Sequence, residues 1–207
     1  MNDIRRHISE VISHPAADLV AAYFAPGPFA GATFDGLGEN DPRAFSPDDL
    51  VAVSLLDVTF EPRAVRSLLE TDRDEFSRLL DRVDANVPLW AADDALLDNA
   101  SELYLRLKQL PGVKRTKTSK LMARKRAHLV PIVDSVIIRE LALGDEVWRP
   151  LRTALEDADL RGQIDALRPA QFSEEQISTL RLLDVAAWMR GSESENARAA
   201  RRKVGQS

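Results

Sequence analysis

Apolar residues recur at helical spacing along most of the chain. The clearest stretch runs from about residue 92 to 110, where six apolar side chains fall on one side of a helix: Leu96, Leu97, Ala100, Leu103, Tyr104 and Leu107. Weaker patterns of the same kind predict helices over about 3–24 with a break at His14-Pro15, and over 61–70, 71–83, 116–126, 133–143, 146–159 and 173–190. Strand signals are almost absent, so the sequence predicts an all-α fold, a compact multi-helix domain.

Local signals set the limits of these elements. Ser46 precedes Pro47 and two acids, which is the pattern of a capped helix start. Glycine and proline gather between residues 25 and 42, which predicts a loop there. Apolar periodicity disappears after Gly191. We therefore expect one domain over residues 1–190 and a disordered tail over 191–207.

Composition excludes several classes of function. No apolar run approaches the ~20 residues that span a bilayer, and the N-terminus lacks a secretory signal, so we expect a cytoplasmic protein with no membrane partner. The chain has no cysteine, which excludes disulfides, cysteine-ligated zinc and iron–sulfur clusters. Its three histidines are scattered, and its glycines form no phosphate loop. The sequence predicts neither a metal site nor a cofactor.

Positive charge is concentrated in one segment of an otherwise acidic chain. Seven basic residues lie between positions 114 and 126 with no acid among them: Lys114, Arg115, Lys117, Lys120, Arg124, Lys125 and Arg126. Because the net charge is −5, the rest of the chain must carry −12. This separation predicts a positive patch on an acidic body. The alternative is a solvated helix face, or one that packs against acids of the same protein.

A short turn, Leu110-Pro111-Gly112-Val113, leads directly into this basic helix. Backbone N–H groups in such a turn and at the following helix start carry partial positive charge and bind phosphate. Lys117, Lys120 and Arg124 lie at i, i+3 and i+7, and therefore share one helix face. The predicted nucleic-acid-binding residues are Gly112, Val113, Lys114, Arg115, Lys117, Lys120 and Arg124, with the cationic face continuing to Arg126.

A second motif follows, in which Pro131-Ile132-Val133 leads to a single acid, Asp134. The turn and this segment together resemble the helix-hairpin-helix DNA glycosylases of the endonuclease III and adenine glycosylase type, whose hairpin precedes an apolar, proline-containing segment that ends in the catalytic aspartate. Asp134 lies 24 positions after Leu110, the spacing expected for that superfamily. The hairpin motif spans about 96–126, and the resemblance covers about 50–143. The segment also resembles an uncharacterised actinobacterial family of unknown function.

The resemblance implies DNA as partner and hydrolysis of an N-glycosidic bond, with Asp134 as the catalytic carboxylate. Thr116 occupies the position of the Schiff-base lysine of bifunctional members, which implies no lyase activity. Asp134 and Thr116 are thus the candidate catalytic positions. Lys114 replaces the second glycine of the hairpin.

Three alternatives remain open. Asp134 also fits the N-cap of a helix, a role compatible with catalysis. Without catalysis, the chain is a nucleic-acid-binding module that uses the same turn. The third alternative is an interaction protein whose basic helix docks on an acidic surface, its own or that of a partner.

Overall fold

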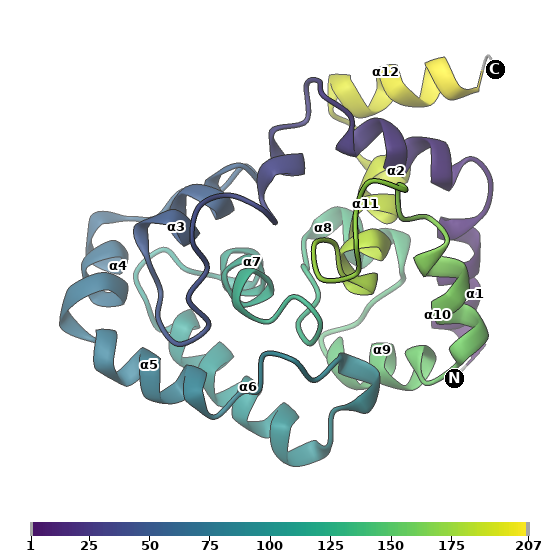
Figure 1. The fold of residues 1–207 in the computed structure, drawn as a ribbon. Coiled ribbons are helices and arrows are strands. Elements are labelled where there is room, and N and C mark those ends of the chain that lie inside the picture. Colours follow the sequence, from purple (N-terminus) through teal and green to yellow (C-terminus); the bar gives the residue numbers. More distant parts are fainter. Residues whose placement is uncertain (1, 206–207) are drawn as a thin grey trace. The chain divides into compact units, whose positions relative to one another are not determined.

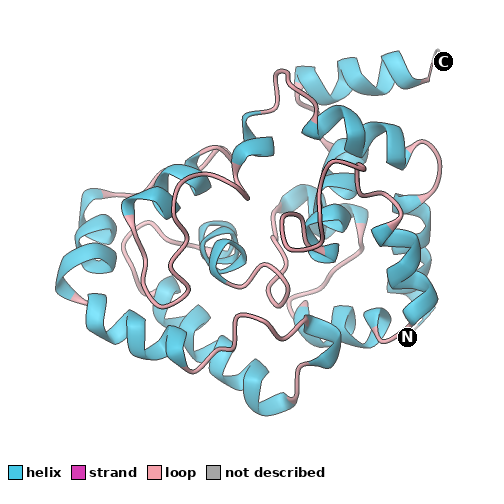
Figure 2. Ribbon diagram, viewed as in Figure 1, coloured by secondary structure: helices cyan, strands magenta, loops and turns pink. Residues whose placement is uncertain are grey.

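The computed structural model describes residues 2–205, and every regular element within them is a helix (Figure 2). The predicted all-α class is therefore confirmed for the described residues. None of these helices has the length and apolar character that crossing a lipid bilayer requires.

The helices group into two compact units. Unit 1 is the described part of Met1–Ala32 and Asp134–Ser207, and unit 2 is Thr33–Val133. Unit 1 contains α1 (Asn2–Ile12), α2 (Ala16–Phe24), α8 (Ser135–Glu140), α9 (Trp148–Leu155), α10 (Ala158–Asp165), α11 (Thr179–Gly191) and α12 (Glu195–Val204). Unit 2 contains α3 (Pro47–Ser54), α4 (Pro62–Arg66), η2 (Ser67–Thr71), α5 (Arg73–Asp81), η3 (Leu89–Ala91), α6 (Asp94–Lys108) and α7 (Arg115–Lys125). The short helical turn η1 (Ala30–Thr33) lies where the chain passes from unit 1 to unit 2.

The sequence contains no obvious boundary between these units. The prediction of a single domain over residues 1–190 stays a prediction, because two compact units of one chain can still unfold in one cooperative transition.

Helix α11 forms the centre of unit 1. It contacts α1, α2, α8, α10 and α12, which surround it in Figure 1. Most of its residues are buried, including the ion pair between Arg181 and Asp184. Arg181 also donates hydrogen bonds to the Tyr23 hydroxyl (3.1 Å) and the Gly31 carbonyl (2.8 Å). A helix that is apolar on nearly all sides is stable only when neighbours cover it, as they do for most residues of α11.

Helix α7 takes the central place in unit 2, although its sequence, RTKTSKLMARK, has no apolar stripe. It contacts α3 and α6, and every residue from Thr118 to Lys125 is buried. The core of unit 2 is therefore built around a helix that carries several cations, which requires each cation to find a partner in the interior.

The helix start marked at Ser46 is confirmed, whereas the helix predicted from residue 173 begins only at Thr179. Ser46 caps α3 in a capping box: its hydroxyl accepts from the Asp49 amide, and the Asp49 carboxylate accepts from the Ser46 amide (2.8 Å). The break at His14-Pro15 falls between α1 and α2. The predicted helix over 146–159 is interrupted, because Asp157 caps a new helix, α10, with its side chain.

The tail differs from the prediction. Residues 195–204 form α12, whose N-cap Ser194 accepts from the Ala197 amide (3.2 Å), so a disordered segment is wrong there. Arg201 donates to the carbonyls of Met189 and Ser192 and fastens α12 to the end of α11. One buried alanine, Ala197, and these polar bonds hold α12, so the helix lacks the apolar periodicity from which a packed helix is predicted. Residues 206–207 of the predicted tail lie outside the described residues.

Candidate functional site

The turn between α6 and α7 has a defined backbone geometry. Helix α6 ends at Lys108, and the Val113 amide donates to the Leu110 carbonyl at 3.1 Å. Gly112 has φ 66°, in the left-handed region that favours glycine. Val113 is fully buried, so its side chain anchors the turn in the core and offers no surface for a ligand.

The start of α7 leaves backbone donors unused. Lys114, in an extended conformation, is the N-cap residue, and its side chain makes no capping bond. The first helical hydrogen bond runs from the Thr118 amide to the Lys114 carbonyl (3.0 Å). Within residues 2–205 the amides of Thr116 and Lys117 have no acceptor. Such amides at a helix start are the groups that bind anions.

The side chains around these amides are basic and reach solvent. Lys114 is exposed, and Arg115, Thr116 and Lys117 are half-buried. The Lys117 ammonium lies 5.9 Å from the centre of the Phe60 ring, a cation–π contact that holds the side chain beside the turn. Four of the predicted binding residues, namely Gly112, Lys114, Arg115 and Lys117, are thus brought together at the surface.

An acid that sequence reasoning missed lies against the turn. A Cβ atom placed on Gly112 would overlap the carboxylate of Glu61, the exposed residue that precedes α4. Two features therefore require glycine at position 112: the positive φ, and the close approach of Glu61, which leaves no room for a Cβ atom. A carboxylate in this position partly neutralises the positive charge of the turn. No sequence signal marks Glu61, because the contact joins residues 51 positions apart.

The predicted cationic face does not continue along α7 at the surface. Lys120 is 7% exposed, and its ammonium donates to the Leu56 carbonyl at 2.6 Å. Arg124 is 3% exposed, and its guanidinium donates to the carbonyls of Phe34 (2.8 Å), Asp35 (2.7 Å) and Leu37. The prediction that Lys120 and Arg124 face a nucleic acid is therefore wrong, because both cations are used inside unit 2.

Lys125 and Arg126 are buried in the same way. The Lys125 ammonium pairs with the Asp49 carboxylate and donates to Asn40 Oδ1 (3.0 Å) and the Asp41 carbonyl (2.9 Å). Burial lowers the pKa of Lys125 from its ordinary value, while the hydrogen bond and charge of Asp49 act in the opposite direction. Arg126 donates to the carbonyls of Leu80 (2.6 Å), Val83 (2.6 Å) and Pro42 (2.9 Å).

These bonds give the C-terminal half of α7 a structural role. Its cations hold the segment 34–42 and the end of α5 through backbone carbonyls, and Asp49 is the buried acid that Arg124 and Lys125 share. The alternative in which the basic helix packs against its own protein thus describes this half of α7. Only the N-terminal end of the basic segment, from Lys114 to Lys117, faces solvent.

Asp134 belongs to unit 1, where it caps α8. Its Oδ1 atom accepts from the amides of Val136 (2.9 Å) and Ile137 (3.0 Å), which confirms the capping interpretation. The residue is half-buried, and no described residue donates a hydrogen bond to Oδ2. Thr116, the other candidate catalytic position, lies in unit 2 in the first turn of α7, where its carbonyl accepts from the Ser119 hydroxyl (3.0 Å).

Ser119 is a second residue that the sequence did not single out. Its hydroxyl oxygen accepts from the Val133 amide at 3.0 Å and lies 3.2 Å from the Val133 carbonyl. One side chain therefore ties the apolar segment that follows the basic helix back onto α7. Within residues 2–205, no group of three or more potential metal ligands is present.

Residues 16–191 match a family of unknown function, DUF6308. The chain belongs to this family. No curated protein and no solved structure matches it. The family covers most of both units, so it includes the turn, the buried cations of α7 and Asp134, but it assigns no activity to any of them.

Proposed function

We propose that the turn between α6 and α7 binds phosphate groups of the DNA backbone. The observation that supports this most directly is the pair of unused amides, those of Thr116 and Lys117, in the helix turn that follows the exposed N-cap residue Lys114. A phosphate oxygen accepts hydrogen bonds from both amides while Lys114, Arg115 and Lys117 supply charge. Phosphate contacts of this kind position a protein on DNA and carry no base sequence information.

The small number of exposed cations sets the expected strength. Each phosphate neutralised contributes about −0.9 to the slope of log K against log salt concentration. Three cations at the turn therefore predict a slope of about −3, against about −6 for all seven basic residues of the segment. Binding is accordingly weak, independent of sequence and strongest at low ionic strength.

Fluorescence anisotropy with a short duplex at about 50 mM salt tests the proposal. Lys114→Gln should weaken binding severalfold and make the salt slope less negative by about 1. The matched control is Arg78→Gln, which removes one exposed cation from α5 in the same unit and should leave both values unchanged. Equal effects of the two variants would show that only net charge matters, and would refute a site at the turn.

A second activity, hydrolysis of an N-glycosidic bond, has one observation in its favour. Asp134 is half-buried, and its Oδ2 atom takes no part in the hydrogen bonds that cap α8, which both go to Oδ1. A partly enclosed carboxylate of this kind stabilises positive charge on a sugar or activates water.

Asp134→Asn separates this activity from capping, because asparagine is an equally good N-cap and α8 should remain intact. The measurement is base release from duplexes that carry damaged or mismatched bases. Release by the natural protein and its loss in Asp134→Asn, with unchanged thermal stability, is the expected result. Equal release by both proteins, or none by either, argues for capping as the only role of Asp134.

A further inference from the structure

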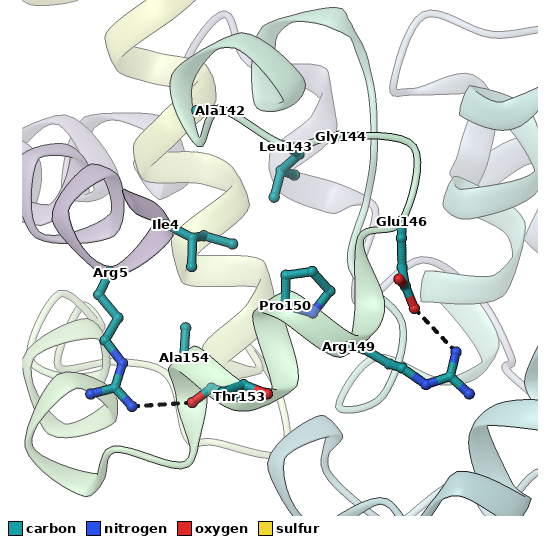
Figure 3. Close-up of a pocket in the computed structure, with 10 residues that line it drawn as sticks. All are labelled: Ile4, Arg5, Ala142, Leu143, Gly144, Glu146, Arg149, Pro150, Thr153 and Ala154. Carbon is teal, nitrogen blue, oxygen red and sulfur yellow. Dashed lines mark hydrogen bonds and ion pairs between the residues drawn. The ribbon is translucent and has the colours of Figure 1, made fainter. Parts of the chain in front are cut away.

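Unit 1 contains a cavity between the N-terminal part of α1, the segment that follows α8, and α9 (Figure 3). Its volume is about 580 Å³, which lies within the range of small-molecule sites in proteins. Ile4, Leu143, Pro150 and Ala154 supply its apolar wall, and Figure 3 shows their side chains grouped in the middle of the site. An apolar wall of this size favours a ligand with a hydrocarbon body.

Two arginines flank the apolar wall on opposite sides (Figure 3). The Arg5 guanidinium donates to the Thr153 carbonyl at 3.2 Å and pairs with Asp157 at 3.3 Å. The Arg149 guanidinium pairs with Glu146 at 3.1 Å. The bond to a backbone carbonyl fixes Arg5 as part of the wall, whereas the acids of both pairs are side chains that can move.

Both ion pairs are accessible to solvent. The exposed fractions of the side chains are 44% and 37% for Arg5 and Asp157, and 49% and 60% for Arg149 and Glu146. Exposed pairs contribute little to stability and are weakened by salt. A ligand carboxylate can therefore replace either acid at a small cost in free energy, because a guanidinium forms bidentate hydrogen bonds with any carboxylate.

The wall of the cavity is held in place by the end of α8. Ala142 has φ 48°, a left-handed conformation, and the Leu143 amide donates to the Ile138 carbonyl at 2.9 Å. These features end α8 and direct the chain into residues 142–144, which line the cavity. A site whose backbone is already fixed loses little entropy when a ligand binds.

We propose that this cavity binds a small organic acid with a hydrocarbon body, the body against Ile4 and Leu143 and the carboxylate on Arg149 or Arg5. A primary amine of the same length cannot accept a hydrogen bond from either guanidinium, and it would have to displace Arg149 from Glu146 or Arg5 from Asp157 to reach an acid. A neutral alcohol would keep the apolar contacts and lose the charge-assisted hydrogen bonds.

Isothermal titration calorimetry of the full chain with octanoate, octylamine and octanol as probes tests this proposal. Octanoate should bind with one site per chain, and octanol and octylamine should each bind about tenfold more weakly, since a charge-assisted hydrogen bond changes affinity by a factor of about ten. Arg149→Gln and Arg5→Gln should each weaken octanoate binding, and the double variant should reduce it at least tenfold.

The matched control is Arg6→Gln, which removes a neighbouring cation of α1 that pairs with Glu10 and does not line the cavity. It should leave octanoate binding unchanged, and thermal unfolding of each variant shows whether unit 1 is intact. Equal binding of octanoate and octylamine would show a purely apolar groove and overturn the proposal. Absence of octanoate binding, or octanoate binding that the Arg5/Arg149 double variant retains, would overturn it as well.

Discussion

Lys125 and Asp49 form an ion pair in which both side chains are completely removed from solvent. Asp49 completes the capping box of α3 and also accepts from Arg124 Nε at 3.4 Å, so one carboxylate serves two cations of α7 and the start of another helix. Buried charges persist only where their partners compensate for lost hydration. The basic segment that the sequence presents as a candidate surface is, for most of its length, part of the framework of unit 2.

Removal of the shared carboxylate should be strongly destabilising. Asp49→Asn leaves Arg124 and Lys125 buried without a negative charge, and the expected loss in the free energy of unfolding is about 3–5 kcal/mol. Urea denaturation followed by circular dichroism measures it. Asp74→Asn, which removes an exposed acid from the first turn of α5, should cost less than about 0.5 kcal/mol. A small effect of Asp49→Asn would mean that the cations are hydrated in solution.

Stability at acidic pH should depend on Arg106. A hydrogen bond from Ser67, together with the hydrogen bond and charge of Arg106, lowers the pKa of Asp72 from its ordinary value. The hydrogen bond and charge of Arg106 lower the pKa of Glu75. Groups with lowered pKa values stabilise the fold above their unfolded values, near pH 4, and this stabilisation is lost as pH falls through the lowered values.

The variant Arg106→Gln should therefore be less stable than the natural protein at pH 7, and the difference should shrink as the pH falls from about 5 to about 2. A residual difference should persist at low pH, because the Arg106 guanidinium also lies 5.0 Å from the centre of the Phe76 ring. Urea denaturation at a series of pH values measures the difference. A difference that stays constant across this range would contradict the assigned contacts.

Glu61 should oppose phosphate binding at the turn. Its carboxylate lies against Gly112, and a nearby charge at a solvated site changes the binding free energy by about 1 kcal/mol or less. Glu61→Gln should therefore tighten binding of a short duplex by up to about fivefold at low salt. Glu70→Gln provides the control, since it removes an exposed acid of η2 in the same unit. Unchanged or weaker binding in Glu61→Gln would show that phosphate does not approach this side of the turn.

Features that depend on neighbouring residues could be predicted from the sequence. The Ser46 cap, the break before Ala16 and the cap at Asp134 each follow from residues within three positions, and the structure has all of them. The helix over 94–108 follows from its apolar spacing in the same way.

The burial of α7 could not be predicted from local pattern. A run of seven cations without an intervening acid is typical of a surface, and the partners that make burial possible are mostly backbone carbonyls, several of them in residues 34–42, which have no sequence signature. The same limit explains why Glu61 and Ser119 were missed, since their importance comes from contacts distant along the chain. At the candidate site, residue type predicted a cationic face from Lys114 to Arg126, and tertiary contacts restrict the solvent-facing part to residues 114–117.

Phosphate binding at the turn is tested at the binding groups themselves when two-dimensional NMR follows the backbone amides of Thr116 and Lys117 during titration with short duplex DNA. At low salt these two amide signals, with that of Lys114, should shift most, and raising the salt concentration should reverse the shifts. The buried residues Lys120 and Arg124 should show small changes. Unperturbed Thr116 and Lys117 amides, or dominant shifts elsewhere in the chain, would contradict phosphate binding at the turn.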